Sequence, residues 1–433
     1  MFSRSFILGC IFSIYSGVLL AAEFALSGTT DKDVAIYKPG EEMVFTFKVL
    51  DEGQPIAGKK LTWTRTGDDG KTEEGEAVAG VEGIQVTTQM DVPGFVRLQV
   101  RAYDEDGSRL EGFVGGWGPN KQGKIFFDGG ACVDPDKLTA GSEPADFDEF
   151  WAGMKEKLAA VPMEVERKEL DVSTDQVKVY AVSIACAGDR PVTGYISVPV
   201  NAEPGSLKAA VYFQGYGVRK HLPTGWKPTD AIVFNVNAHG MELGREEAYY
   251  DQLKQDLKKY AFDKEENSDP ETAYFHDMSL RVMRAFEYVK SLPEWDGKNL
   301  ESNGGSQGGL QGLWGAALEP AVSSTNNWSP WCCDLEGDKV GRINGWQPEY
   351  TEALAYYDPV FHVRRTQAKI HMIANYGDYT CPPSGVWIVY NETPHENKSI
   401  EVKQGCTHGY TMKPHMSYTI APSGITKVGM KDK

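Results

Sequence analysis

The segment 304–309, Gly-Gly-Ser-Gln-Gly-Gly, contains a Gly-x-Ser-x-Gly pattern centred on Ser306. In this pattern the serine sits on a sharp turn between a strand and a helix, and the glycines beside it leave the space that the turn requires. A strand-like stretch, 299–302, precedes the pattern, and a helix-forming stretch, 310–318, follows it. The pattern is weak alone in a chain with 46 glycines, where the alternative is a turn without chemistry. Its context, however, predicts a nucleophilic serine.

Two residues further along the chain are suited to activate this serine. A serine hydroxyl needs a histidine to remove its proton, and that histidine needs a carboxylate to orient it. In one large class of hydrolases the acid and then the histidine follow the serine along the chain. Asp378 follows a predicted strand at 369–375, and His408 follows another at 399–403. The sequence therefore predicts Ser306, Asp378 and His408 as a catalytic triad.

Three other residues compete for these roles. His395 precedes the last predicted strand, so we expect it at the opposite end of the sheet. His415 follows that strand but lies outside the glycine-flanked turn that carries His408. Asp358 lies in a segment typical of a loop. We therefore favour His408 as the base and Asp378 as the acid.

Backbone amides are expected to hold the negative charge that develops on the ester oxygen during attack. Such an oxyanion hole needs converging N–H donors, and removing one donor typically costs about 3–4 kcal/mol of transition-state stabilisation. One donor is expected from Gln307, directly after the nucleophile. The other is expected from Tyr216, in the Gly-Tyr-Gly turn after a predicted strand at 209–214. The alternative for Tyr216 is an ordinary glycine turn.

The region that carries these residues alternates between strands and helices. Apolar strands at 209–214, 231–237 and 369–375 are interspersed with a predicted helix at 271–292. Continuous apolar strands between helices imply a mostly parallel sheet with helices on both faces. The sequence therefore predicts an α/β-hydrolase fold for residues 146–433.

The residues before this region are predicted to form a separate unit. In 23–125, short β-branched and aromatic runs alternate with polar turns, which favours an all-β, immunoglobulin-like sandwich domain. A Gly- and Pro-rich linker is predicted over 126–145. Asp146 is then expected as the N-cap of a helix ending near residue 160, with Glu149 completing a capping box.

Residues 1–22 are typical of a secretory signal peptide. Arg4 supplies a positive start, 6–20 is mostly apolar, and Ala22 precedes the expected cleavage point. Because Arg4 is the leader's only charged residue, its removal changes the formal net charge from −17 to −18. This acidity argues against nucleic acid or an anionic membrane as a partner, and no other apolar run is long enough to span a bilayer. We expect a periplasmic or extracellular protein.

Six cysteines follow the predicted leader, and an even number in an exported chain permits disulfides. Cys381 and Cys406 stand close in sequence to Asp378 and His408. If the loops carrying the acid and base lie close together, a Cys381–Cys406 bridge is expected between them, and the alternative is that both thiols stay reduced. No cysteine or histidine spacing fits a zinc site, so neither a metal nor another cofactor is predicted.

Five short segments of the second region are similar to motifs of one known family, and they occur in the family's order. They are 146–151 (DFDEFW), 215–217 (GYG), 304–309 (GGSQGG), 354–358 (LAYYD) and 377–384 (GDYTCPPS). On these motifs, residues 144–412 resemble the acetyl xylan esterase and cephalosporin-C deacetylase family, carbohydrate esterase family seven. The resemblance implies the triad and the oxyanion amides named above. It also implies removal of acetyl groups from an acetylated oligo- or polysaccharide, without a cofactor.

The chain departs from this family at three points. The family's Arg-Gly-Gln motif is replaced by His239-Gly240-Met241, and the glutamate after the catalytic histidine is replaced by Gly409. The β-rich first domain is additional to the compact family members. These differences bear on the preference for acetyl groups and on the family's ring-like hexamer, so the sequence leaves a homo-oligomer open.

Two other functions compete with an esterase at this point. Serine peptidases of the prolyl-oligopeptidase-like type also combine an all-β domain with a hydrolase domain. A carbohydrate-binding protein with an inert hydrolase domain would use Trp63 and Trp117 as a sugar-stacking face, although single tryptophans in sandwiches are usually core residues. The presence of Ser306, Asp378 and His408 favours the esterase.

Overall fold

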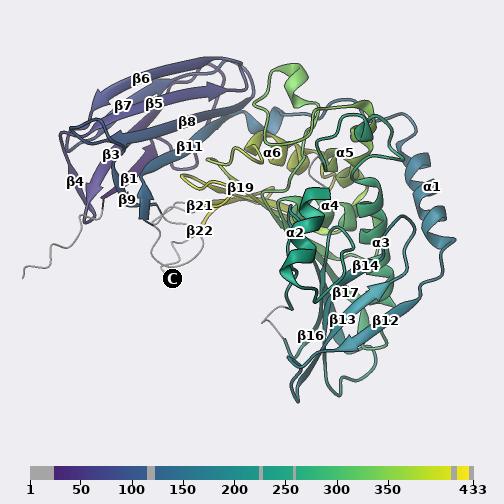
Figure 1. Ribbon diagram of the computed structural model, residues 1–433. Coiled ribbons are helices and arrows are strands. Elements are labelled where there is room, and N and C mark those ends of the chain that lie inside the picture. The colour runs from purple at the N-terminus through teal and green to yellow at the C-terminus, as the bar shows by residue number, and fades with distance from the viewer. Residues whose placement is uncertain (1–23, 115–121, 224–227, 257–259, 411–416, 429–433) are drawn as a thin grey trace, which may run out of the picture.

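The computed structural model describes residues 24–114, 122–223, 228–256, 260–410 and 417–428. A β-rich N-terminal part is followed by a larger part in which helices pack on a long sheet (Figure 1). No helix among the described residues is long and apolar enough to cross a bilayer.

The N-terminal part consists of two main sheets, which are mostly antiparallel. Its strands are β1 (Phe24–Thr30), β2 (Ile36–Tyr37), β3 (Met43–Asp51), β4 (Gln54–Ile56), β5 (Lys60–Gly67), β6 (Thr72–Val78), β7 (Ile84–Thr88), β8 (Gly94–Tyr103), β9 (Glu111–Phe113), β10 (Gln122–Lys124) and β11 (Phe126–Val133). One sheet has the order β1-β3-β4 with β7 paired to β3, and the other has the order β2-β11-β8-β5-β6. Phe47 of β3 packs edge-on against Phe127 of β11, with ring centroids 5.2 Å apart, so the inner faces of the two sheets share a core.

The linker predicted over 126–145 is wrong in its first half. Residues 126–133 form β11, which pairs antiparallel with β8 over its whole length. The glycines in this strand serve close packing: a Cβ on Gly130 would lie 2.0 Å from the carbonyl oxygen of Val96. A glycine-rich stretch that resembles a linker in sequence is therefore a central strand of the sheet.

The larger part is built on an eleven-stranded sheet of order β12-β13-β14-β16-β15-β17-β18-β19-β20-β21-β22. Its strands are β12 (Val165–Glu169), β13 (Val177–Ile184), β14 (Val192–Pro199), β15 (Leu207–Phe213), β16 (Ala231–Val236), β17 (Trp295–Gly305), β18 (Ser324–Trp328), β19 (Lys369–Asn375), β20 (Lys398–Lys403), β21 (Ser417–Ala421) and β22 (Gly424–Val428). From β16 to β20 all neighbours are parallel, which confirms the predicted parallel core. The strands outside this core are antiparallel.

Helices pack against this sheet and bury its central strands. They are α1 (Phe147–Ala159), α2 (Glu247–Asp256), α3 (His276–Lys290), α4 (Gln307–Leu318), α5 (Pro359–His362) and α6 (Pro383–Glu392), with 3₁₀ turns η1 (Pro135–Lys137), η2 (Glu266–Ser268), η3 (Gly337–Val340), η4 (Glu352–Tyr357) and η5 (Val363–Arg365). Every residue of β14 is buried, so both faces of the sheet are covered at this strand. Gly315 brings α4 close to Phe286 of α3, where a Cβ would lie 2.5 Å from the ring.

The sequence does not predict strand β18, because the buried residues of this strand are polar. Its sequence, Ser-Thr-Asn-Asn-Trp, has no apolar run. Thr325 Oγ1 donates to the carbonyl oxygen of Ser302, and Asn327 Nδ2 donates to Thr325 Oγ1 at 2.7 Å. Buried polar side chains are tolerated when such bonds satisfy them.

Helix α1 begins where predicted, but the predicted capping box is wrong. The Asp146 side chain makes no capping hydrogen bond. Its Oδ1 instead accepts a hydrogen bond of 2.5 Å from the hydroxyl of Tyr356 in η4. A tertiary contact has therefore replaced the local one.

The two parts of the chain meet beside the loops that follow β19 and β20. Gln404 bridges them, because its Oε1 accepts from Gly130 N at 3.0 Å and its Nε2 donates to Gly130 O at 2.7 Å. Phe95 of β8 packs on Tyr376 with ring centroids 5.7 Å apart. A Cβ on Gly377 would lie 2.1 Å from the carbonyl oxygen of Asp128. The β-rich part therefore supports the loops that carry Asp378 and His408.

We expect Gln404→Ala to lower the free energy of unfolding by about 1–3 kcal/mol, because it breaks the two hydrogen bonds to the backbone N–H and C=O of buried Gly130. Denaturant unfolding followed by circular dichroism measures this change. Gln176→Ala is the control, since that residue is exposed and its side chain forms no hydrogen bond that the structure describes. Equal stability losses in the two variants would contradict the prediction.

Candidate active site

Ser306 occupies a strained turn between β17 and α4. Its backbone φ is 56° and its ψ is −126°, a conformation that costs a residue other than glycine about 1–3 kcal/mol. Two backbone hydrogen bonds of 3.0 Å hold it there: Ser306 N donates to Trp328 O, and Ser306 O accepts from Trp331 N. This geometry matches the strand-to-helix turn expected from the sequence pattern.

The glycines around Ser306 permit backbones to approach too closely for side chains. A Cβ on Gly304 would lie 2.2 Å from the carbonyl oxygen of Gly308. A Cβ on Gly308 would lie 2.2 Å from the carbonyl oxygen of Phe213 in β15. Because both obstacles are backbone atoms, a larger residue at either position would displace α4 from the sheet.

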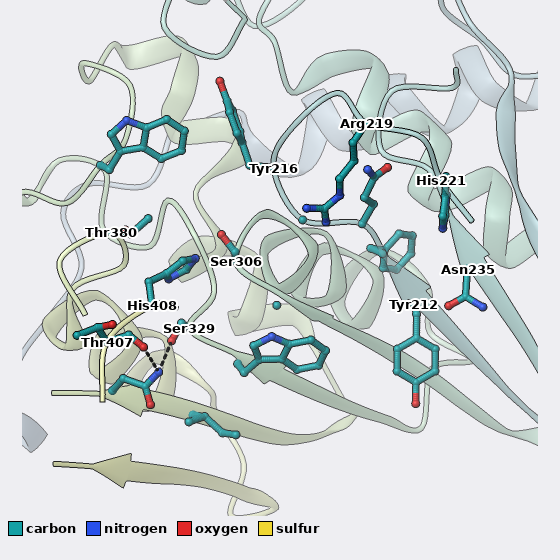
Figure 2. A pocket seen from close by; sticks show the side chains of 18 of the residues that line it. Tyr212, Tyr216, Arg219, His221, Asn235, Ser306, Ser329, Thr380, Thr407 and His408 are labelled. Carbon is teal, nitrogen blue, oxygen red and sulfur yellow. Dashed lines mark hydrogen bonds between the residues drawn. The ribbon is translucent and has the colours of Figure 1, made fainter. Parts of the chain in front are cut away.

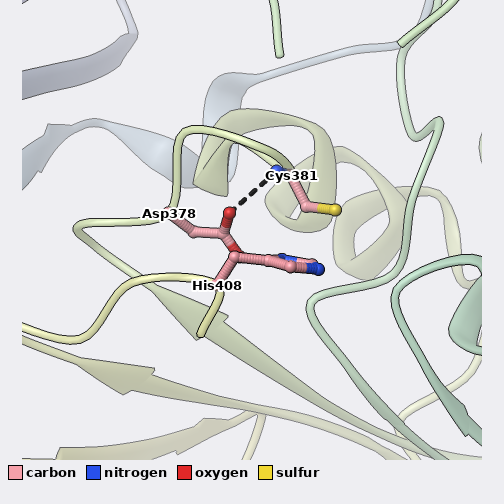
Figure 3. A group of neighbouring side chains, drawn as sticks. All are labelled: Asp378, Cys381 and His408. Atoms are coloured by element: carbon pink, nitrogen blue, oxygen red, sulfur yellow. Dashed lines mark hydrogen bonds and ion pairs between the residues drawn. The ribbon is translucent and has the colours of Figure 1, made fainter. Parts of the chain in front are cut away.

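Buried Asp378 and half-buried His408 form a hydrogen-bonded pair at the ends of β19 and β20. Asp378 Oδ2 lies 2.9 Å from His408 Nδ1, and Asp378 Oδ1 accepts from the backbone amides of Thr380 and Cys381, both at 2.9 Å. Figure 3 shows the bond from Cys381, with His408 beside the carboxylate. Gly377 N also donates to Cys406 O at 2.9 Å, which joins the two loops directly. The carboxylate is thus fixed by three partners.

The charge of Asp378 controls the protonation of His408. Burial of the imidazole disfavours its charged form, but the hydrogen bond and negative charge of Asp378 outweigh this effect. The pKa of His408 is therefore raised above its usual value of 6.5. The pair can accept and then hold a proton, which is the property required of a general base and its orienting acid.

Ser306 and His408 line one cavity of about 1100 Å³, which opens at the ends of β15, β17 and β19. Figure 2 shows both side chains in this cavity, with Tyr216 above them. Asn375, which also lines the cavity, donates through Nδ2 to Ser329 Oγ at 3.3 Å and to Thr407 O at 3.1 Å. The parallel strands bring these residues together because their carboxyl ends lie at the same edge of the sheet.

Of the two residues predicted to supply oxyanion amides, Gln307 directly follows Ser306 and Tyr216 lines the same cavity. Gln307 is the first residue of α4, and first-turn amides have no acceptor within their own helix. Tyr216 follows β15, in a loop where a Cβ on Gly215 would lie 3.6 Å from Gly305 O. The Tyr216 ring stacks on Tyr260 with centroids 4.7 Å apart, which anchors this loop.

A buried polar chain behind Gln307 was not anticipated from the sequence. Tyr274 donates to Gln307 Oε1 at 2.8 Å, and its hydroxyl oxygen lies 2.8 Å from His239 Nε2. Burial, together with the positive charges of Arg281 and Arg190, lowers the pKa of His239 to about 3, so the ring is neutral. His239 replaces an arginine of the family motif, and this departure was the one signal in the sequence that pointed to the network.

The predicted Cys381–Cys406 bridge is wrong, because the structure has no disulfide between these two residues. The Cys381 amide instead donates to Asp378 Oδ1 at 2.9 Å. The two loops lie close together, as expected, but this closeness does not lead to a bond between the two sulfur atoms.

Cys381, Asp378 and His408 each offer an atom that could ligate a metal, and these atoms lie within 4.8 Å of one another. The described residues contain no other group of this kind. The acid–base hydrogen bond and the two amides already engage the Asp378 carboxylate and His408 Nδ1. Hydrogen bonding around the Asp378 carboxylate therefore explains why these three residues lie close together.

The rival residues lie elsewhere. Asp358 is buried and accepts hydrogen bonds from the amides of Asp334, Leu335 and Val360, so it organises a loop and the start of α5. His395 follows α6 and does not line the cavity.

Of the two tryptophans considered for sugar stacking, the structure describes only Trp63. Trp63 of β5 lies against Gly75 of β6, where a Cβ would meet the indole at 2.4 Å, and it packs against the core. Trp117, like His415, falls outside the described residues.

Comparison with known proteins places the second part of the chain in one family. A family model described as acetyl xylan esterase (AXE1) matches residues 138–352 and 342–420. Acetyl esterase Axe7A of Xylanibacter ruminicola is 28% identical over 269 residues, which cover 57% of this chain and 60% of that protein. The chain thus spans less than two thirds of this relative's length.

Two solved structures share the fold. An acetyl xylan esterase from Paenibacillus sp. R4 superposes with a TM-score of 0.54 at 21% identity, covering 64% of this chain and 94% of its own. Acetyl xylan esterase 1 from Thermoanaerobacterium sp. JW/SL YS485 gives 0.52 at 19% identity, covering 65% and 93%. Together with the large sheet, these likenesses identify an α/β-hydrolase fold. Because the family model extends over more than half of the chain, the protein belongs to the acetyl xylan esterase family.

Proposed function

We propose that this protein is a serine esterase that removes acetyl groups from carbohydrate hydroxyls. The main support is the position of Ser306 on a strained turn, in the same cavity as a histidine that is bonded to buried Asp378. Membership of the acetyl xylan esterase family supports acetylated carbohydrate as the substrate class.

In the proposed mechanism, Ser306 Oγ attacks the ester carbonyl carbon while His408 Nε2 takes the hydroxyl proton. The amides of Tyr216 and Gln307 bind the oxyanion, and the buried chain through Tyr274 holds Gln307 in place. His408 then returns the proton to the departing sugar oxygen, which leaves acetyl-Ser306. A water molecule, deprotonated by His408, attacks this ester, and acetate departs as the serine is restored.

Acetate release from acetylated xylo-oligosaccharides tests this function directly. We expect turnover of these substrates and of p-nitrophenyl acetate, together with covalent labelling by a fluorophosphonate. A peptide anilide should remain intact. Cleavage of the anilide in preference to the esters would favour a peptidase, and absence of both labelling and turnover would favour an inert carbohydrate-binding protein.

Activity is expected to rise with pH through a midpoint above 6.5. Asp378 stabilises the protonated form of His408, and this form cannot accept the serine proton. Raising the pH through the elevated pKa therefore increases the active fraction. The pH profile of kcat/KM on p-nitrophenyl acetate reports this midpoint, and a midpoint below 6 would contradict the assignment.

Short acyl chains are expected to be preferred, with acetate esters cleaved faster than butyrate esters and octanoate esters barely cleaved. The reason is family membership. The ratio of kcat/KM across a p-nitrophenyl ester series measures the preference. A maximum at longer chains would indicate a lipase-like enzyme.

We also propose that the β-rich part is an immunoglobulin-like domain and that residues 1–22 direct export of the protein and are then removed. The face-to-face sheets support the first statement, and the apolar N-terminal sequence supports the second. Export would place the protein in the periplasm or outside the cell. N-terminal sequencing of the processed chain tests the cleavage, which we expect before Glu23.

A further inference from the structure

The charge lining the active-site cavity is opposite to that of the whole protein. The protein has a formal net charge of −17. The described residues that line the cavity include Arg219, Lys220 and Lys403, but no aspartate or glutamate. Each of the four other cavities described in the structure has at least two carboxylates in its lining. The basic lining is therefore particular to the cavity that contains Ser306.

The three cations are not equally free to meet a ligand. Glu401 lies 3.4 Å from Lys403 and offsets its charge. Among the described residues, neither Arg219 nor Lys220 forms an ion pair with a carboxylate. Arg219 is exposed and Lys220 is half-buried. The positive charge that no described carboxylate offsets therefore lies on Arg219 and Lys220, in the segment that follows Tyr216.

Arg219 lines the same cavity as Ser306 and His408. Figure 2 shows its guanidinium reaching into the cavity from the loop after β15, on the same side as Ser306. This loop also carries Tyr216, whose amide is proposed to bind the oxyanion. A ligand whose ester carbonyl lies at Ser306 would therefore place its neighbouring groups near the guanidinium.

We propose that the preferred substrates are acetylated oligosaccharides that carry a uronic acid carboxylate close to the acetyl group, and that Arg219 binds this carboxylate. The planar guanidinium can bind a carboxylate through two parallel hydrogen bonds. Since the protein as a whole repels anions, a local excess of positive charge in the cleft is needed to concentrate an anionic substrate there. The carboxylate is bound but not altered, and the reaction still consumes one water and releases acetate.

The rest of the cavity fits a sugar chain around such a contact. Trp328 and Trp346 line it and remain 44% and 45% exposed. Trp346 stacks on Trp331, so the exposed part of each indole is what can contact a pyranose ring. Exposed aromatic side chains in a cleft with a few polar groups are typical of binding sites. A simple anion such as phosphate would leave these side chains unused, which favours a charged sugar.

The proposal rests on the proposed esterase function and is tested with matched substrates. One is an acetylated xylo-oligosaccharide with a glucuronic acid branch, and the other is the same molecule with that carboxylate reduced to the alcohol. We expect kcat/KM for acetate release to be about tenfold or more higher for the charged substrate at low ionic strength. The ratio should fall as salt is added, because salt screens the attraction.

Arg219→Gln should bring this ratio close to one. Arg167→Gln is the matched control, because it removes the same charge from the exposed strand β12, away from the cavity, and should keep the ratio. A ratio near one in the wild type, or an unchanged ratio in Arg219→Gln, would overturn the carboxylate site while leaving the esterase intact. No acetate release from either substrate, with no turnover of p-nitrophenyl acetate, would overturn the proposed function and this inference with it.

Discussion

Ser306→Ala is expected to lower kcat on p-nitrophenyl acetate by about 10⁶, the loss typical when a triad loses its nucleophile. Without the hydroxyl no acetyl-enzyme can form, and the remaining oxyanion amides only polarise the ester. The fold should be retained, because alanine has the same Cβ as serine at the strained φ of 56°. Circular dichroism and the unfolding midpoint check this point. Acetate release by the purified variant measures the loss.

Ser329→Ala provides the control for this substitution. Ser329 lines the same cavity and accepts a hydrogen bond from Asn375, but it lies in the segment after β18 and has no role in the proposed attack. We expect its kcat to stay within about tenfold of the wild type. A Ser306→Ala variant that retains activity in that range would remove Ser306 from the mechanism.

Asp378→Asn is expected to lower kcat by about 10⁴, as the loss of the orienting carboxylate does in serine hydrolases of this type. An amide cannot hold the imidazole in the required tautomer while also accepting from the amides of Thr380 and Cys381. Its neutral side chain also no longer stabilises the imidazolium. The pH midpoint of the residual activity should therefore move to lower pH, since the hydrogen bond and charge that raise the pKa of His408 are lost.

Asp358→Asn is the matched control, because Asp358 is also a buried aspartate that accepts backbone hydrogen bonds. Burial raises the pKa of Asp358 to about 7, but its contacts are with a loop and α5. We expect this variant to lose stability and to keep the wild-type pH midpoint of activity. Equal shifts of the pH midpoint in both variants would contradict the proposal that Asp378 specifically raises the pKa of His408.

Much of the site could be predicted because its residues follow strands that are recognisable in the sequence. The apolar runs of β15, β16 and β19 indicated a parallel sheet, and functional side chains gather at one end of such a sheet. The order of Ser306, Asp378 and His408 along the chain then sufficed to select them. The pairing of Asp378 with His408 agrees with that selection.

Elements whose burial depends on partners far along the chain were not predicted. Strand β18 is polar and is stabilised by hydrogen bonds to β17, so it lacks the apolar pattern on which detection depends. Strand β11 contains glycines that suggest a linker, although they allow close contact with β8. In both strands, the polar residues or glycines are explained by contacts with a neighbouring strand, which the local sequence does not reveal.

The sequence by itself determined the turn at Ser306, the strand ends that carry Asp378 and His408, and the boundary at which α1 begins. These features depend on local backbone preferences and on apolar periodicity, which short segments carry with them. Only the tertiary structure decided the contacts of individual side chains: Cys381 forms no bridge to Cys406, and Asp146 binds Tyr356 instead of capping its helix. It likewise placed Arg219 in the cavity and connected Gln307 through Tyr274 to His239. The physical reason is that a polar side chain takes the partner that the packed structure brings within reach, and that partner is set by the fold as a whole.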